Sequence, residues 1–428
     1  MKLHEAGNLA QARTGFERIL KKNPREVNAL HYLGVVLHQQ GQHEKGARLI
    51  QKAIEIYPKH WAAYSNLGGI FYKTGQFANA ERAFRKVIEL QPSDVRAYIN
   101  LCNSLSHLGR DEEAINAGRT ATILEAENKH CWLSLANALR KKGQYESAIE
   151  CYEKAIALDP KLFEAHGGLC HCISELEIQA PGSHKRMEKT AMAYRNWLNA
   201  DPGNPVASYQ LAAIEGNDAF KRSPDEFVSV FFDQFAETFD RNLADLEYSA
   251  PRLIAERVGV RLGQPGASLD VLDAGCGTGL LAAGLRPFAR SLTGVDLSSR
   301  MLEKARARNL YDRLERAELT GFLKGHPACF DLLILADTLI YFGELEELIR
   351  AMEGSLRSGG IAICTLERLE DDAGDYRLNP HGRFSHHEDY LKRCLSAAGL
   401  SLVSCLDEVI RKERGQEVSG MLIEVLKA

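Results

Sequence analysis

The sequence predicts a multidomain protein in which an all-α solenoid of helical repeats is followed by an α/β domain with a largely parallel sheet. A glycine-led segment recurs every 34 residues through the first part of the chain. After Ser223 this interval stops, and strand-like and helix-like segments alternate, which is typical of a parallel sheet flanked by helices. The length of 428 residues also exceeds what one ordinary core holds.

Bulk composition narrows the class of protein. The net charge of −4 comes from 53 basic and 57 acidic side chains, so we expect no nucleic-acid partner. No apolar run approaches the roughly 20 residues of a spanning helix, so no membrane association is expected. The ten cysteines show no framework spacing, and MKLHEAGNLAQA contains no apolar region of a signal peptide, so we expect no secretion. These features predict a cytoplasmic protein with free thiols and no metal site.

The repeats have a fixed length. The segments GNLAQA, GQHEKG, GQFANA, GRDEEA and GQYESA begin 34 residues apart, at Gly7, Gly41, Gly75, Gly109 and Gly143. Prolines keep the same interval, with Ala126 in place of one of them. Each glycine lets the chain reverse between two helices, and the small residues Ala80, Ala114 and Ala148 let those helices approach closely. Residues 1–162 therefore resemble an array of tetratricopeptide repeats.

The array departs from the pattern at both ends. Only MKLHEAG stands where a full first helix belongs, which leaves open whether the natural chain begins upstream of Met1. A sixth unit from Phe163 is interrupted by EIQAPGSHKRM. A helix near Pro205 to Glu215 is expected to cap the solenoid, so the repeat domain is predicted to span residues 1–215.

The resemblance implies a protein or peptide partner. Four asparagines occupy repeated positions on successive first helices and would hydrogen-bond an extended peptide backbone: Asn66, Asn100, Asn103 and Asn137. The alternative is that they are solvated or internally bonded helix residues.

Residues 216–262 are predicted to form a linker and entry helices. Ser223 is a candidate N-cap with Pro224 at the first helical position, and Phe227, Phe231, Phe235 and Phe239 recur at helical spacing. A second helix is expected from Ala250 to Val260.

Residues 263–428 are predicted to form the sheet domain. LDVLDAG, SLTGVD, FDLLILAD and GGIAICTLE are strands separated by helices. The end of the chain predicts a β-hairpin, with strands from Leu400 to Arg411 and from Val418 to Leu426 and a turn at Gly415. A last hairpin strand that runs antiparallel in a parallel sheet is typical of seven-stranded sheets of a Rossmann-like kind.

The segment VLDAGCGTG indicates a nucleotide-cofactor loop after the first strand. Its glycines let the backbone approach a ligand, and Asp296, 23 residues after Asp273, would accept hydrogen bonds from ribose hydroxyls. A dinucleotide and S-adenosylmethionine both satisfy this pattern. The G-x-G-x-G spacing, Glu318 at the end of a third strand and the terminal hairpin favour S-adenosylmethionine, whose amino group suits an acid such as Asp273.

Residues from about 220 to 428 resemble class I S-adenosylmethionine-dependent methyltransferases, through VLDAGCGTG, GVDLS, FDLLILADTLIY and RSGGIAI. The whole chain is similar to bacterial methyltransferases with N-terminal tetratricopeptide repeats. The resemblance implies S-adenosylmethionine as cofactor, with contacts at Asp273, Gly275, Gly277, Asp296, Leu297, Met301, Glu318, Leu319 and Asp337. Cys276 and Gly279 complete the loop, with Cys276 expected to pack, and Phe239 and Tyr248 are expected to approach the cofactor from the entry helices.

Two positions depart from the family pattern. Glu318 stands where an aspartate is common. ADTLIY replaces an N-P-P-[YF] tetrapeptide, which argues against methylation of amide or adenine nitrogens.

The acceptor site is expected on the loops after the fourth and fifth strands. Candidate general bases are His381, Asp337 and Glu367, with Tyr341 nearby. The segment YRLNPHGRFSHH would bind the acceptor through Arg377 and Arg383, or would be a solvated loop with Ser385 capping the next helix. Arg383 would orient an acidic acceptor or fold back onto a carboxylate.

These observations predict a methyltransferase whose array recruits a protein or peptide acceptor. The alternatives are a small-molecule or glycan acceptor, with the array used for assembly, and a scaffold with a weakly active enzyme domain. The acceptor atom and the oligomeric state stay open, because this fold serves many reactions.

Overall fold

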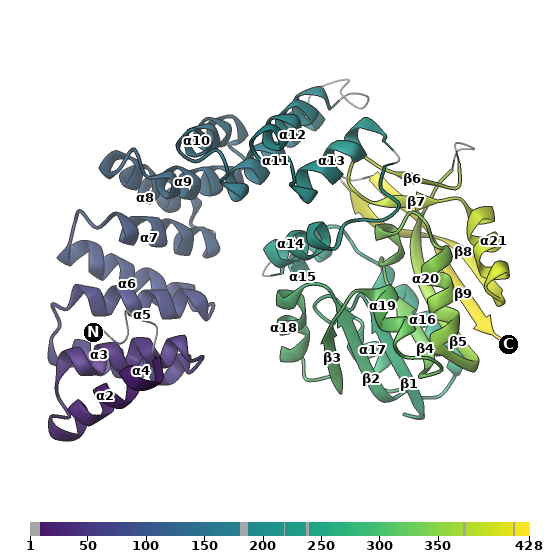
Figure 1. Ribbon diagram of the computed structural model, residues 1–428, viewed down its shortest axis with the longest axis horizontal. Coiled ribbons are helices and arrows are strands. Elements are labelled where there is room, and N and C mark those ends of the chain that lie inside the picture. The colour runs from purple at the N-terminus through teal and green to yellow at the C-terminus, as the bar shows by residue number, and fades with distance from the viewer. Residues whose placement is uncertain (1–8, 180–186, 218, 237–238, 371–373, 414–415) are drawn as a thin grey trace. The chain divides into compact units, whose positions relative to one another are not determined.

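The computed structural model describes residues 9–179, 187–217, 219–236, 239–370, 374–413 and 416–428 (Figure 1). The chain divides into two compact units, the first ending at Asp201 and the second beginning at Pro202. The expected first glycine, Gly7, the interruption at 180–186 and the turn at Gly415 lie outside the described residues.

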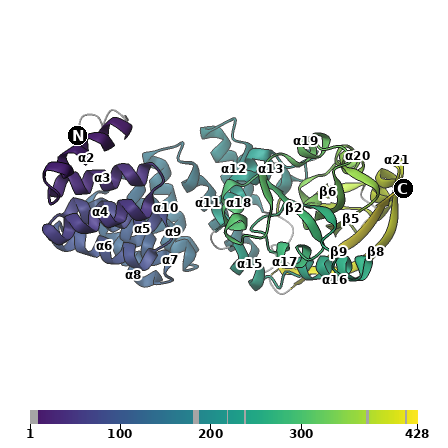
Figure 2. The same cartoon turned by 90° about the horizontal axis from the view of Figure 1, so that it is seen from below.

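The first unit is built from paired helices, as predicted (Figure 2). Helix α2 (Leu9–Lys22) precedes the pairs. They are α3 (Val27–Gln39) with α4 (His43–Ile56), α5 (Trp61–Lys73) with α6 (Phe77–Leu90), α7 (Val95–His107) with α8 (Asp111–Leu124), α9 (Lys129–Lys141) with α10 (Tyr145–Leu158), and α11 (Phe163–Gln179) with α12 (Glu188–Ala200).

The turn glycines of the array are required by backbone conformation. Gly41, Gly75, Gly109 and Gly143 have φ between +72° and +80°. A Cβ at any of them would meet no atom within 4 Å, so space is not the constraint. At the small residues, by contrast, space is the constraint, because Ala80, Ala114 and Ala148 are fully buried where helices pack together. The two kinds of residue together explain the 34-residue pattern.

The helix expected to cap the solenoid forms where it was predicted, as α13 (Pro205–Glu215), and Asn204 caps it through a bond from Ala207 N to its Oδ1. By its contacts this helix belongs to the second unit, so the boundary between compact units lies before it and not after residue 215. The buried Tyr209 carries the attachment, since its hydroxyl lies 2.6 Å from Ser223 Oγ and donates to Gly382 O at 2.9 Å.

The entry helices are α14 (Asp225–Phe235), α15 (Phe239–Asp245) and α16 (Ala250–Leu262). Two expectations about them are wrong. Ser223 does not cap α14, because its buried hydroxyl pairs with Tyr209 and the cap position falls on Pro224. Phe239 does not share a helix with Phe231 and Phe235, because α14 ends at Phe235 and Phe239 begins α15.

In the part of the second unit that the structure describes, nine strands form a mixed sheet. They are β1 (Leu269–Ala274), β2 (Ala289–Asp296), β3 (Arg313–Arg316), β4 (Phe330–Leu335), β5 (Leu356–Arg368), β6 (Tyr376–Leu378), β7 (Phe384–His386), β8 (Leu400–Glu413) and β9 (Gln416–Lys427). Strands β3, β2, β1, β4 and β5 are parallel neighbours in that order (Figure 1). Strand β9 runs antiparallel between β5 and β8, which confirms the predicted hairpin. The predicted seven-stranded sheet corresponds to β3, β2, β1, β4, β5, β9 and β8, to which β6 and β7 are added.

The short strands β6 and β7 were not predicted. They form an antiparallel pair from the segment YRLNPHGRFSHH, and β7 also pairs with the end of β5. Ser385 is buried in β7 and does not cap the next helix, α21 (Glu388–Ala397), whose N-cap is His387.

The remaining helices follow the parallel strands: α17 (Ala282–Leu285), α18 (Ser299–Ala307), α19 (Leu319–Lys324), the 3-10 turn η1 (Leu339–Tyr341) and α20 (Glu346–Ser355). Alternate residues of β1 enter two separate cores, Val271 one and Leu272 with Ala274 the other. The sheet is therefore packed on both faces. Within the described residues we find no helix that is both long enough and apolar enough to cross a membrane.

Candidate functional site

The loop after β1 depends on three glycines with positive φ. Gly275, Gly277 and Gly279 have φ of +78°, +52° and +80°. A Cβ at Gly275 would lie 2.4 Å from Thr338 Oγ1, and one at Gly279 would lie 2.9 Å from the Tyr311 ring. At Gly277 the nearest atom would be at an ordinary 3.7 Å, so there the backbone alone requires glycine. The loop therefore packs tightly against Thr338 at its first glycine and against Tyr311 at its last.

Asp296 ends β2 beside this loop. Its Oδ2 accepts a bond from Gly277 N at 2.9 Å and its Oδ1 accepts one from Ser298 N at 2.8 Å. Each oxygen keeps a lone pair for a further donor. Burial raises the pKa of this carboxyl, while the backbone hydrogen bonds lower it. Ser298 also caps α18, accepting from Met301 N at 3.1 Å.

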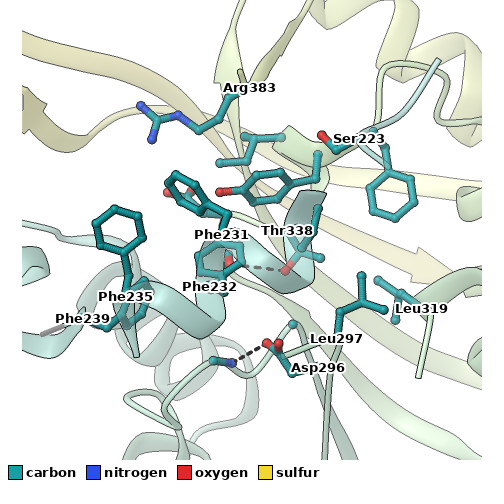
Figure 3. Close-up of a pocket in the computed structure, with 18 of the residues that line it drawn as sticks. Ser223, Phe231, Phe232, Phe235, Phe239, Asp296, Leu297, Leu319, Thr338 and Arg383 are labelled. Carbon is teal, nitrogen blue, oxygen red and sulfur yellow. Dashed lines mark hydrogen bonds between the residues drawn. The ribbon is translucent and has the colours of Figure 1, made fainter. Parts of the chain in front are cut away.

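A cavity of about 320 Å³ opens at this edge of the sheet (Figure 3). Its walls come from the ends of β1, β2 and β4, from η1, and from α14 and α15. Figure 3 shows Asp296, Leu297 and Leu319 toward one end, Arg383 at the other, and Phe231 and Phe232 between them. The aromatic lining consists of Phe231, Phe232, Phe235, Phe239, Tyr248, Tyr341 and Phe342.

Two carboxylates join the entry helices that carry these rings to the edge of the sheet that holds the glycine loop. Asp233 on α14 accepts a hydrogen bond from Ser298 Oγ. Asp240 on α15 accepts from Thr278 Oγ1 and pairs with Arg308. These contacts hold α14 and α15 against the glycine loop and the end of β2. Phe232 and Tyr341 meet edge to face with centroids 5.6 Å apart.

A buried ionic cluster lies at the opposite end. Arg411, only 3% exposed, bonds Asp337 Oδ2 at 3.1 Å and Glu413 Oε1 at 2.7 Å, and it also pairs with Glu367. Arg383 Nε lies 3.1 Å from Glu367 Oε1, and its guanidinium also pairs with Glu413. Of these five residues, Asp337, Arg383 and Arg411 line the cavity.

Comparisons with known proteins agree with this architecture. A family model described as a methyltransferase domain matches residues 272–364, and three tetratricopeptide repeat models match residues 25–93, 65–128 and 131–162. A ubiquinone biosynthesis O-methyltransferase of Xanthomonas campestris pv. campestris (strain B100) is 30% identical over 180 residues, which are 39% of this chain and 71% of that protein. The chain belongs to the methyltransferases.

Two further similarities are partial. Methyltransferase-like protein 27 of Homo sapiens is 46% identical over 111 residues, so the match spans 26% of this chain and 45% of that protein. A crystal structure of MamA is 22% identical and covers 37% of this chain and 94% of that chain, with a TM-score of 0.36, which is too low to assign a function.

Eleven of the predicted site residues line the cavity of this methyltransferase. They are Phe239, Tyr248, Gly275, Gly277, Asp296, Leu297, Glu318, Leu319, Asp337, Tyr341 and Arg383. The other predicted cofactor and acceptor residues lie outside its lining: Asp273, Cys276, Gly279, Met301, Glu367, Arg377 and His381. Cys276 and Met301 are buried packing residues.

Asp273 and Glu318 already have partners. Asp273 is 2% exposed and its Oδ2 accepts from Tyr311 Oη at 2.6 Å, while burial raises its pKa to about 6. Glu318 is the N-cap of α19, accepting from Thr320 N and Gly321 N at 2.9 and 2.7 Å. Although desolvation opposes ionisation, these bonds and the Arg222 guanidinium, 2.7 Å away, lower its pKa.

The three candidate bases differ in position. Glu367 is 5% exposed and pairs with Arg411 behind the cavity wall. His381 Nε2 lies 3.5 Å from Glu367 Oε2, outside the lining, and keeps 39% of its side chain exposed. The surrounding side chains partly desolvate its ring and lower its pKa to about 4. Asp337 is the one of the three that lines the cavity.

Sequence reasoning missed Arg411, Phe232, Arg222 and Thr338, all of which line the cavity. Arg411 lies within IRKERG, where a basic residue in a strand ordinarily indicates a solvated face. Only the hairpin topology, which places β8 near the end of β4, brings its guanidinium to Asp337.

In the helical array, two of the four asparagines are engaged with other side chains. Asn66 Nδ2 lies 2.7 Å from His31 Nε2, and Asn137 Oδ1 accepts from Tyr152 Oη at 2.7 Å. Asn100 and Asn103 are half-buried on α7.

Proposed function

We propose that this chain is an S-adenosylmethionine-dependent methyltransferase whose cofactor occupies the cavity beside the glycine loop. The observation that carries the proposal is the Asp296 carboxylate, which two backbone N–H groups hold at the end of β2 with acceptor capacity left for two ribose hydroxyls. Leu297 and Leu319 supply apolar walls for a purine. A dinucleotide would instead need a G-x-G-x-x-G loop against a helix N-terminus, which the spacing here does not provide.

The aromatic lining supports a cationic cofactor. Ring faces attract cations, and Phe232, Phe239, Tyr248 and Tyr341 surround the space between Asp296 and Asp337. When bound, S-adenosylmethionine supplies a methyl group on a sulfonium that is already activated for in-line attack. The residues of the chain then have to align the acceptor and exclude water, which the aromatic cover on α14 and α15 accomplishes. Asp273 is buried outside the cavity lining, where it accepts a hydrogen bond from Tyr311 Oη.

Asp337 is the proposed general base for a hydroxyl or protonated amine acceptor. Its carboxylate lines the cavity, whereas His381 and Glu367 do not. Arg383 pairs with the carboxylates of Glu367 and Glu413. We therefore propose that it forms part of the wall of the acceptor site and does not bind an acidic acceptor.

For the array we propose recruitment of a protein or peptide acceptor. A second candidate, a small-molecule acceptor with the array used for assembly, is favoured by the aromatic lining and by the cavity volume of about 320 Å³. It is also favoured by the Xanthomonas relative, whose name places it in ubiquinone biosynthesis.

Transfer of labelled methyl from S-adenosylmethionine into lysate fractions tests the activity. Wild type is expected to label a fraction and form S-adenosylhomocysteine, and Asp296→Ala is expected to lose most of both. Asp270→Ala is the matched control, because Asp270 lies at the other end of β1 and pairs with Arg290 and Arg357. Equal labelling by wild type and Asp296→Ala would contradict the proposal.

The same assay separates the two acceptor classes. Label in macromolecules that falls in the Asn100→Ala/Asn103→Ala variant, and not in the exposed control Asn116→Ala, supports recruitment by the array. Label confined to the small-molecule fraction supports the second candidate.

A further inference from the structure

We propose that Arg411 is a positioning residue, which holds the Asp337 carboxylate ionised and directed into the cavity. The inference rests on the proposed function, because it assigns Asp337 to the acceptor side of the cofactor. Arg411 belongs to β8 of the terminal hairpin, and its Nη1 donates to Asp337 Oδ2 at 3.1 Å. Both side chains line the cavity.

The Asp337 carboxylate is held at both oxygens. Thr365 Oγ1, from β5, donates to Oδ1 at 2.8 Å, and Arg411 donates to Oδ2. The backbone at Asp337 has φ of +49°, and its N–H donates to the same Thr365 hydroxyl at 2.8 Å. A left-handed backbone at a side-chain-bearing residue persists only where its surroundings determine it, and such residues cluster at functional sites. Here β5 and β8 provide those surroundings.

The charge around Asp337 makes Arg411 its main source of neutralisation. Burial raises the pKa of Asp337 and the Glu367 carboxylate raises it further, whereas Arg411, Thr365 and Arg383 lower it; burial is the largest effect, so the pKa stays above its ordinary value. Tyr248 and Tyr341 also face it, and burial raises the pKa of both phenols, to about 12 for Tyr341, so they stay neutral. The guanidinium of Arg383 is committed to Glu367 and Glu413.

Loss of Arg411 would therefore leave two carboxylates, Asp337 and Glu367, without the guanidinium they share. A buried carboxyl in that position takes up a proton. A protonated Asp337 cannot take a proton from the methyl acceptor. It also lacks the negative charge that would stabilise a nearby sulfonium. The Arg411 side chain thus acts on the reaction through Asp337, without taking part itself.

Proton exchange on binding S-adenosylmethionine tests this in the full chain. Titration calorimetry in two buffers of different ionisation enthalpy, at about pH 7.5 where Asp273 is already ionised, counts the protons released. Wild type is expected to release almost none. Arg411→Met is expected to release close to one per cofactor bound, because the cation re-ionises Asp337. Arg411→Lys is expected to restore most of the wild-type behaviour.

Two controls make the result specific. Asp337→Asn/Arg411→Met is expected to release no proton, which separates Asp337 from Glu367. Arg257→Met removes a guanidinium from the buried Glu424 of the same hairpin, away from the cavity, and is expected to match wild type. Binding to Arg411→Met without proton release, or release that persists in the double variant, would overturn the proposal.

A measurement on the folded wild type makes the test independent of how Arg411→Met folds. Infrared difference spectra between wild type and Asp337→Asn at neutral pH are expected to contain no band of a protonated carboxyl. Such a band, lost in Asp337→Asn, would overturn the role of Arg411. Failure of wild type to bind S-adenosylmethionine would instead refute the proposed function, and the infrared result would still decide the state of Asp337.

Discussion

Backbone conformation decides which residues fit at the ends of β1 and β4. Gly275 and Asp337 both lie in the left-handed region, with φ of +78° and +49°. At Gly275 a side chain is also excluded by Thr338, whereas Asp337 keeps its side chain because Thr365 and Arg411 hold it. The backbone strain at Asp337, of order 1–3 kcal/mol, lies at the residue proposed to act on the acceptor.

Gly275→Ala is expected to lower the free energy of unfolding by roughly 1–3 kcal/mol and to weaken cofactor binding, because the new Cβ meets Thr338 Oγ1 at 2.4 Å. Urea unfolding measures the first effect. The control is Gly259→Ala within α16, where a Cβ meets nothing within 4 Å, and stability there should hold or rise by about 0.5–1 kcal/mol. Equal stability of Gly275→Ala and wild type would show that the loop does not need this glycine.

The raised pKa of Asp273 predicts that this residue contributes to the free energy of unfolding in a pH-dependent way. Burial raises its pKa in the folded chain to about 6, above its ordinary value, so the folded state binds the proton more tightly than the unfolded state does. Relative to Asp273→Asn, wild type should lose stability as pH rises from about 4 to about 6, by up to about 3 kcal/mol, and change little above that. Unfolding of both proteins across this range checks it. A constant difference would mean that burial does not shift this group.

The sequence predicted those site residues that belong to a short continuous motif. Asp296 and the glycines were predictable because a loop after a strand carries its own spacing. Arg411 was not, because its partners Asp337 and Glu367 come from β4 and β5 and meet it only after the hairpin has paired. The roles of Asp273 and Glu318 depend on side chains far along the chain, Tyr311 and Arg222.

At the scale of elements, helices and strands with strong periodicity were predictable, and their packing partners were not. The terminal hairpin and the repeat helices formed where expected. The apolar face of α13 gave no sign of whether it would pack on the array or on the sheet domain. It belongs to the second unit because Tyr209 finds partners at Ser223 and Gly382. The β6–β7 pair escaped prediction because each strand has three residues.

Tyr209→Phe tests how firmly α13 is attached. The hydroxyl is buried and bonded at 2.6 and 2.9 Å, and its loss leaves Ser223 and the Gly382 carbonyl without this partner. The second unit should lose about 1–3 kcal/mol of stability. Tyr57→Phe, at a tyrosine that is 51% exposed, is the control and should be neutral. A neutral Tyr209→Phe would mean that apolar packing alone holds the helix.

At the scale of the whole molecule, two units with different architectures share one chain. The first repeats a helix pair at a fixed interval, and the second surrounds a cavity at the carboxyl edge of a parallel sheet, where α/β proteins bind their ligands. The methyltransferase assignment belongs to the second unit, since the domain model matches residues 272–364. The proposals for the cofactor and for the array are separable, because they rest on different residues.

The affinity of the full chain for S-adenosylmethionine, measured by titration calorimetry, tests the central claim most directly. Wild type should bind one equivalent, and Asp296→Ala should bind 10- to 100-fold more weakly, as expected when charge-assisted hydrogen bonds worth about 1.5–3 kcal/mol are lost. Asp270→Ala should bind like wild type. No binding by wild type, or equal affinity of wild type and Asp296→Ala, would contradict the account.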